Sequence, residues 1–192
     1  YERAAALPSA DASTHVKLGD AYAKLDRLDE AVVAYRAALS KQPDSGPALL
    51  GLGGVLVRAG KAEEGMTMLA KAAPLVNSAR AYDRLGVAHI ALGQPREALA
   101  SFEQARSLDP RDIDIASNLT LAAALSGHKD KVAAMAKATL ASQGLEEYQR
   151  RNLILAMCIA GQEEDAKRAV ANVPSFGAGT MEGLIKKGRE IR

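Results

Sequence analysis

A repeat of 33–34 residues is the feature that most limits how this chain can fold. Aligned with itself at that step, the chain shows a leucine series: Leu18, Leu52, Leu85, Leu119 and Leu153. A second series follows eight residues later, with Asp26 in the first unit and then Gly60, Gly93, Gly127 and Gly161. Two more series of mostly small residues follow the leucines by thirteen and by twenty positions, beginning at Ala31 and Ala38. Such coincidence at one period indicates stacked copies of one structural unit.

Each unit reads as two helices joined by a tight turn. In the first helix, the leucine and a larger residue four positions later share one face, as in Leu18 and Tyr22. The second helix places a bulky residue between small ones, as Tyr35 lies between Ala31 and Ala38. The glycines between the helices suit a left-handed helix end. Prolines such as Pro43 end the second helix, so the pattern predicts antiparallel helix pairs.

These residues resemble the tetratricopeptide repeat family. Repeats one and three match its pattern most fully, in Leu18, Gly19, Tyr22, Ala31, Tyr35, Ala38 and Pro43, and in Leu85, Gly86, His89, Ala98, Phe102, Ala105 and Pro110. Repeats four and five depart from it, since Thr120 and Ile154 replace the small residue after leucine and Ala136 and Val170 replace the aromatic. The resemblance implies an all-α, right-handed superhelix (an α-α solenoid) of about five helix pairs, over 12–41, 46–74, 79–108, 113–142 and 147–173.

We expect one solenoid domain over residues 1–192. Its repeats are expected at 12–45, 46–78, 79–112, 113–146 and 147–174. Tyr1 aligns with Tyr35 at the repeat step, so residues 1–11 are expected to end an earlier repeat, with more sequence upstream in the native protein. The repeat register is expected to end at Pro174. Residues 175–192 are expected to form a loop and a short helix, capped by Thr180, that covers the last repeat or occupies a groove.

Composition excludes several classes of protein. The 25 basic and 23 acidic residues leave a net charge of +2, too balanced for electrostatic binding of nucleic acid. A single cysteine, Cys158, rules out an intramolecular disulfide. No apolar run approaches the 18 residues of a membrane span.

The sequence contains no recognisable arrangement of catalytic residues. His15, His89 and His128 occupy unrelated places in different repeats and do not form a ligand set. Cys158 lacks a histidine partner in a motif. We therefore expect no enzyme, no catalytic or metal site and no cofactor.

A protein-binding groove is expected on the wall formed by the first helices. The wall positions lie two before, two after and five after each leucine. They are Val16, Asp20 and Ala23; Leu50, Gly54 and Val57; Asp83, Val87 and Ile90; Ser117, Leu121 and Ala124; and Arg151, Leu155 and Cys158. The C-terminal half is apolar, which favours an amphipathic helix or an extended peptide as ligand, unless neighbouring helices or the tail cover it. The Lys/Asn carboxylate clamp of some family members is not matched by Val16, Asp20, Gly51, Arg84 and Asn118.

The last two repeats are also similar to the tetratricopeptide lipoproteins of tight-adherence (Tad/Flp) pilus assembly. The likeness lies in Asn118–Ala122 and Asn152–Ala156, both Asn-Leu-x-Leu-Ala, each followed by a glycine at the turn. It implies a pilotin-like assembly factor for a pilus secretin at the periplasmic face of the outer membrane, anchored by a lipid upstream of this chain. Two alternatives stay open: a cytoplasmic chaperone or adaptor of a secretion system, and a repeat domain attached to a separate enzyme.

Overall fold

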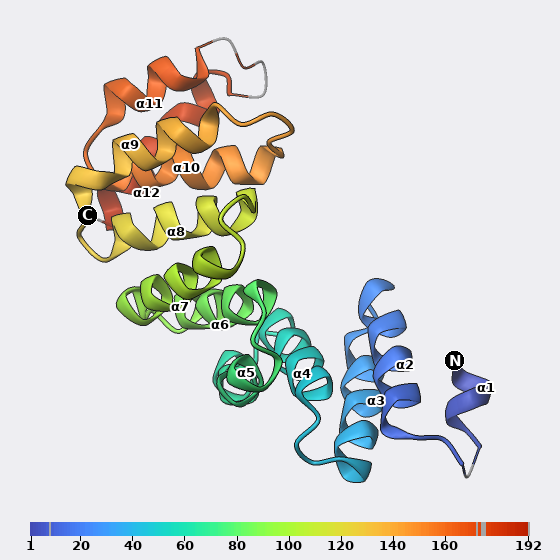
Figure 1. Cartoon of the computed structure of the whole chain (residues 1–192). Coiled ribbons are helices and arrows are strands. Elements are labelled where there is room, and N and C mark those ends of the chain that lie inside the picture. Colours follow the sequence, from blue (N-terminus) through green and yellow to red (C-terminus); the bar gives the residue numbers. More distant parts are fainter. Residues whose placement is uncertain (8, 172, 174–175, 192) are drawn as a thin grey trace. The chain divides into compact units, whose positions relative to one another are not determined.

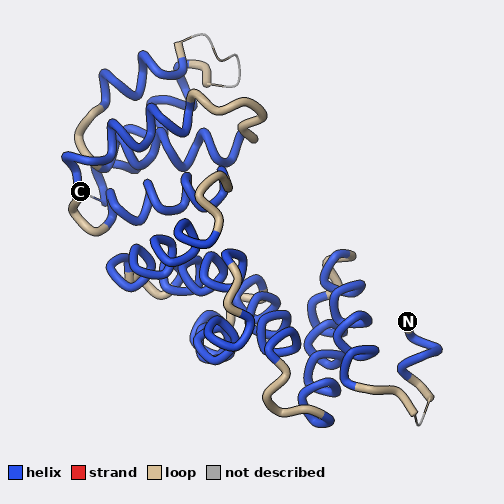
Figure 2. Tube along the Cα trace, in the orientation of Figure 1, coloured by secondary structure: helices blue, strands red, loops and turns tan. Residues whose placement is uncertain are grey.

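The computed structural model describes residues 1–7, 9–171, 173 and 176–191, and every regular element in those ranges is a helix (Figures 1 and 2). The helices are α1 (Glu2–Ala5), α2 (Ala12–Lys24), α3 (Leu28–Lys41), α4 (Gly46–Arg58), α5 (Ala62–Val76), α6 (Ala79–Ala91), α7 (Pro95–Leu108), α8 (Ile113–Leu125), α9 (Lys129–Leu140), α10 (Glu147–Ile159), α11 (Glu163–Val170) and α12 (Ala178–Ile191). The all-helical architecture expected from the repeat is therefore confirmed. The five expected helix pairs correspond to α2–α3, α4–α5, α6–α7, α8–α9 and α10–α11.

The ends of the helices follow the proline and glycine signals. Gln42 and Asp109 precede prolines, have extended backbone and end α3 and α7. Each turn within a pair has a residue of positive φ, at Asp26 and then at Gly60, Gly93, Gly127 and Gly161. Pro74 does not end α5, which continues to Val76, because a proline in the last turn removes only one helical hydrogen bond.

The chain divides into two compact units, Tyr1–Gly93 and Gln94–Arg192. In the first, unit 1, the core gathers Ala31, Tyr35, Leu52, Val55 and Leu56 from α3 and α4. The Tyr35 ring fills the space left by two glycines. A Cβ on Gly19 of α2 would lie 2.7 Å from the ring, and a Cβ on Gly51 of α4 would overlap it. Helices α2 and α4 are thus held close to α3 through a single aromatic side chain.

The N-terminal helix α1 is only four residues long, and the Tyr22 hydroxyl of α2 donates to Glu2 Oε1 at 2.5 Å. Its expected membership of an earlier repeat stays a prediction.

In the second compact unit, unit 2, the core is formed by α8, α9, α10, α11 and α12. It contains Leu153 and Ile154 at its centre and extends to Met181 and Leu184 of α12. Helix α12 begins at Ala178, with a hydrogen bond from the Met181 amide to the Gly177 carbonyl, so Thr180 lies in its first turn and the expected cap there is wrong. The boundary expected at 174–175 lies outside the described residues.

The expected end of the repeat register at Pro174 stays a prediction. The residue after the repeat leucine is Gly19, Gly53, Gly86, Thr120 and Ile154 in turn, and the residue 34 positions beyond Ile154 is Gly188, which is buried. Lys187 stands where the preceding leucine would be, so the match is confined to one position.

Candidate functional site: a basic groove in unit 1

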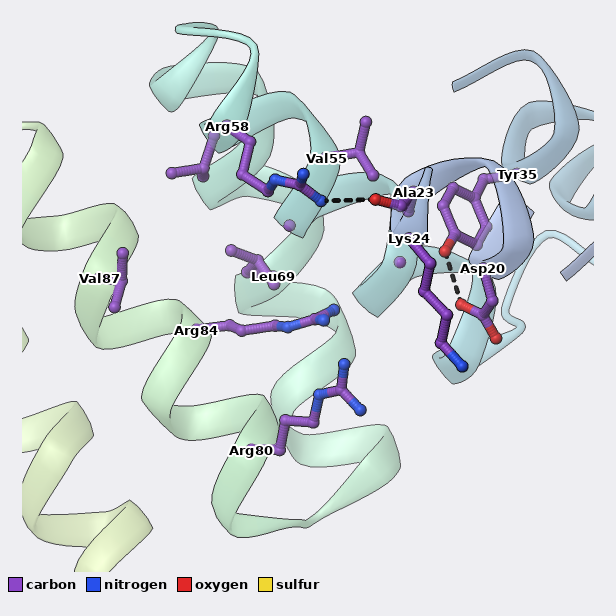
Figure 3. A pocket seen from close by; sticks show the side chains of 13 residues that line it. Asp20, Ala23, Lys24, Tyr35, Val55, Arg58, Leu69, Arg80, Arg84 and Val87 are labelled. Atoms are coloured by element: carbon purple, nitrogen blue, oxygen red, sulfur yellow. Dashed lines mark hydrogen bonds between the residues drawn. The ribbon is translucent and has the colours of Figure 1, made fainter. Parts of the chain in front are cut away.

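A groove of about 430 Å³ opens between the first helices of unit 1 (Figure 3). Helices α2, α4 and α6 supply most of its walls, and Tyr35 of α3 and Leu69 of α5 reach it from the second helices. The lining residues are Asp20, Ala23, Lys24, Tyr35, Gly51, Gly54, Val55, Val57, Arg58, Leu69, Arg80, Arg84 and Val87.

Positive charge dominates this groove. Lys24, Arg58, Arg80 and Arg84 are set against one carboxylate, Asp20. Arg58 donates to the Ala23 carbonyl at 3.0 Å and pairs with Asp26 at 2.6 Å, outside the lining. Arg80 and Arg84 lie one turn apart on α6, and Figure 3 shows both guanidinium groups extending across the groove towards α4 and α2.

Arg84 is the most enclosed of the four cations. Its Nη1 donates to the Leu50 carbonyl of α4 at 3.2 Å. A Cβ built on Gly54 would lie 3.0 Å from that nitrogen, so the glycine leaves room for the guanidinium. Burial, and then the neighbouring Arg80 charge, lower the pKa of Arg84 below its ordinary value. The groove therefore holds positive charge that its own residues do not fully compensate.

Tyr35 connects the core of unit 1 to the groove. Its ring is buried, but its hydroxyl donates to Asp20 Oδ1 at 2.6 Å. Burial, followed by this hydrogen bond, raises the pKa of Tyr35. This hydrogen bond holds the Asp20 carboxylate against α3, so that the carboxylate does not project freely into the groove.

The predicted wall positions of unit 1 are only partly in this groove. Asp20, Ala23, Gly54, Val57 and Val87 line it. The other four predicted residues, Val16, Leu50, Asp83 and Ile90, are half-buried on the same helices and do not contribute to the lining.

The predicted wall of unit 2 is largely buried. Ser117, Ala124 and Cys158 are fully buried, and the expectation that they face a groove is wrong. Leu121 and Leu155 are partly buried against the core, and Arg151 is exposed and pairs with Glu147. Helix α12 packs on α10 and covers Cys158, which is one of the alternatives that the sequence left open.

The sequence prediction missed the basic side chains because it used only three positions per helix. Lys24 and Arg58 each lie six residues after the leucine of their repeat, and Arg80 and Arg84 are four apart on one face. The 34-residue spacing of the two cations Lys24 and Arg58 is the signal that could have revealed those two side chains.

Within the described ranges, no group of three or more His, Cys, Asp and Glu side chains is placed to hold a metal ion. No helix in that part of the chain has the length and apolarity that crossing a membrane requires.

Family profiles match the part of the sequence that forms this groove. Two profiles described as tetratricopeptide repeat match residues 22–85 and 79–112, which together contain every lining residue of the groove of unit 1 except Asp20. The chain is a tetratricopeptide repeat protein. Its fold is that of a protein–protein interaction scaffold, and proteins of this family are typically not enzymes themselves.

Solved structures of other tetratricopeptide repeat proteins share the fold. YrrB, described as having an unusual peptide-binding site, is 19% identical, with a TM-score of 0.77 over 96% of this chain and 97% of that one. PilF of Pseudomonas aeruginosa is 15% identical, with a TM-score of 0.76 over 100% and 86%. The first repeat domain of Spaghetti (RPAP3), bound to an HSP90 peptide, is 24% identical, with a TM-score of 0.55 over 59% and 90%.

A curated relative is much longer than this chain. The CTR9 homolog of Arabidopsis thaliana is 28% identical over 116 residues, which are 59% of this tetratricopeptide repeat chain but 11% of that protein.

Proposed function

We propose that the groove of unit 1 binds an extended, acidic segment of a partner protein. The observation that carries this proposal is the excess of positive charge in the groove, with Arg80 and Arg84 one turn apart on α6. The carboxylates of a ligand would balance the positive charges of the groove that Asp20 alone does not balance. Guanidinium groups bind carboxylates through two parallel hydrogen bonds.

The groove also has apolar surface for the ligand. Val57 and Val87 lie between the cations, while Val55 and Leu69 also line the groove but are almost fully buried. A segment that alternates acidic and apolar residues therefore fits better than a uniformly acidic one. The RPAP3 domain, bound to the peptide SRMEEVD, is a precedent for an acidic segment on this fold.

The test is fluorescence anisotropy with two labelled peptides, one alternating Glu and Leu and one alternating Lys and Leu. The wild-type chain should bind the Glu peptide, more weakly at high salt because exposed charges are screened. Arg80→Glu should weaken that binding at least tenfold. Lys71→Glu, the same charge change at an exposed site on α5 outside the groove, should leave it within about twofold. Equal effects of the two variants, or equal binding of both peptides, would refute the proposal.

We also propose a biological setting from the Asn-Leu-x-Leu-Ala motifs in α8 and α10. The protein acts as an envelope assembly factor for a Tad/type IV-like pilus secretin, at the periplasmic face of the outer membrane, with a lipid anchor upstream. The likeness to PilF supports this at the level of the fold alone.

Affinity capture from separate envelope and cytosol fractions of the source organism tests this setting. Enrichment of a secretin or of pilus subunits from the envelope supports it. Capture of exported substrates from the cytosol alone would favour the cytoplasmic chaperone, and a second catalytic domain in the full-length protein would favour the enzyme-linked alternative.

A further inference from the structure

Equivalent positions of the repeats have opposite environments in the two units. The positions five and six residues after the repeat leucine are open to the groove in repeats one and two, where they are Ala23, Lys24, Val57 and Arg58. In repeats four and five they are Ala124, Leu125, Cys158 and Ile159, all apolar. Ala124, Cys158 and Ile159 are each at most 2% exposed. The surface that forms a groove in unit 1 is therefore present in unit 2 but covered.

On α10, the helix that covers these positions is the C-terminal helix α12. Figure 1 shows it beside α10, in the deepest red. Its apolar side chains Met181, Leu184 and Ile185 pack into the same cluster as Ala124 and Cys158. With Gly188, these residues lie at positions i, i+3, i+4 and i+7, the spacing by which an amphipathic helix anchors in a groove.

Gly188 allows the two helices to touch. A Cβ on Gly188 would lie 2.5 Å from Cys158 Cβ, 2.8 Å from the Cys158 carbonyl carbon and 3.0 Å from the Ile159 nitrogen. Two of these atoms are backbone, which cannot move aside cheaply. Any residue with a side chain at position 188 must push α12 away from α10.

The outer side of α12 is held by charge. Arg189 donates from Nε and Nη2 to the two carboxylate oxygens of Glu163, at 2.9 and 2.6 Å, and so ties α12 to the start of α11. Glu182, Lys186, Lys187 and Glu190 are exposed. Helix α12 thus has the apolar anchors, the charged outer face and the close fit of a bound amphipathic helix, but belongs to the same chain.

We propose that the covered groove of unit 2 is a binding surface for an amphipathic helix, and that α12 is its resident ligand, which a partner helix displaces. The partner helix presents apolar residues at i, i+3 and i+4 and a glycine at i+7. This surface is separate from the basic groove of unit 1 and takes a ligand of different chemistry, so the two proposals stand or fall independently.

The single thiol of the chain, on Cys158, reports directly on whether α12 is in place. In the wild-type chain, Cys158 is 0% exposed, and Ellman's reagent should label it slowly. Gly188→Leu should accelerate labelling at least tenfold, while hydrogen exchange in α8 and α10 remains slow. The matched control is Gly183→Leu, the same change in the same helix at a position where a Cβ meets nothing within 4 Å, and it should leave labelling within about twofold.

The decisive step is rescue with a peptide. A synthetic peptide of residues 178–191, added to the Gly188→Leu chain, should slow labelling towards the wild-type rate. The same peptide carrying Gly188→Leu should not. If the wild-type peptide gives no protection, or if labelling accelerates only together with loss of protection in α8 and α10, α12 is an inseparable part of the core and the proposal is wrong.

A second variant keeps the test available if Gly188→Leu does not fold. Arg189→Glu breaks the pairing with Glu163 without altering the apolar contacts, and should accelerate labelling severalfold and show the same peptide protection. Its control is Arg168→Glu, which breaks the exposed pair with Asp165 on α11 and should have no effect on labelling.

Discussion

Tyr35 shows how one side chain can set the distance between helices. Its ring occupies the space opposite Gly19 and Gly51, and its hydroxyl reaches Asp20 in the groove. The repeat pattern predicted a bulky residue between small ones at this place. It could not predict the hydrogen bond, because Asp20 belongs to a different helix and was expected to face a ligand.

This packing predicts opposite outcomes for the same substitution at two places in α4. Gly51→Ala forces a methyl group into the Tyr35 ring, and overpacking of this kind costs about 1–3 kcal/mol. Gly54→Ala meets only the flexible end of Arg84, so the gain in helix propensity of up to about 1 kcal/mol should leave stability equal or higher. Chemical denaturation of both variants measures the difference. Equal destabilisation would show that the tyrosine is not held as tightly as its contacts indicate.

Neighbouring helices in unit 2 are linked by polar side chains at the repeat spacing. Tyr148 and Gln149 of α10 both donate to Asp114 of α8, the second at 2.6 Å to Oδ1. The hydrogen bond that Tyr148 donates to the Asp114 carboxylate, and then partial burial, raise the pKa of Tyr148 to about 12. The phenol must therefore be protonated for the link to form.

The sign of the pH dependence follows from that shift. The pKa of Tyr148 rises from 10.0 in the unfolded chain to about 12 in the folded one. The stabilisation is thus complete below pH 10 and is lost as the pH rises towards 12. Tyr148 is half-exposed, so the effect should be modest. Thermal melts between pH 9 and 12 should show wild type and Tyr148→Phe converging as the pH rises; a constant gap would contradict the assigned hydrogen bond.

Sequence patterns located the helices well because each boundary rests on local chemistry. The positive-φ turns at Gly60 and Gly127 and the extended residue before Pro43 need no information from distant residues. The docking of α12 on α10 does need such information. The exposure of Cys158 therefore could not be inferred from its position in its own repeat.

At the scale of the whole molecule, the two units have separate cores. The cluster around Tyr35 and the cluster around Leu153 share no residue. In repeat proteins the free energy of unfolding is approximately a sum of terms from single repeats and from the interfaces between neighbours. A destabilising substitution therefore affects its own repeat and the adjoining repeats most.

Truncation of one core leucine in each unit tests this separation. Leu56→Ala and Leu153→Ala should each cost about 2–5 kcal/mol in the unit that contains them. Hydrogen exchange read by mass spectrometry should show lost protection in α2–α5 for the first and in α8–α12 for the second. Loss of protection along the entire chain in both variants would instead show one cooperative unit.

The candidate site was predictable in its helices but not in its chemistry. The first helices were expected to form the wall, and α2, α4 and α6 do so in unit 1. The charge was missed because Arg80 and Arg84 reach the groove by length and not by their positions on the helix. Long basic side chains extend across several residues, and a rule based on helical position does not capture that reach.

The glycines of α4 also affect the order of events when the chain folds. Gly51, Gly53 and Gly54 lie together in the middle of a thirteen-residue helix, and each weakens an isolated helix by about 1 kcal/mol relative to alanine. A short segment of this composition cannot nucleate by itself. We expect α3 and α5, which lack such a cluster, to become helical earlier, and α4 to form only as it inserts between them. The same absence of side chains that lets Tyr35 and Arg84 approach so closely thereby makes α4 a late step in assembly.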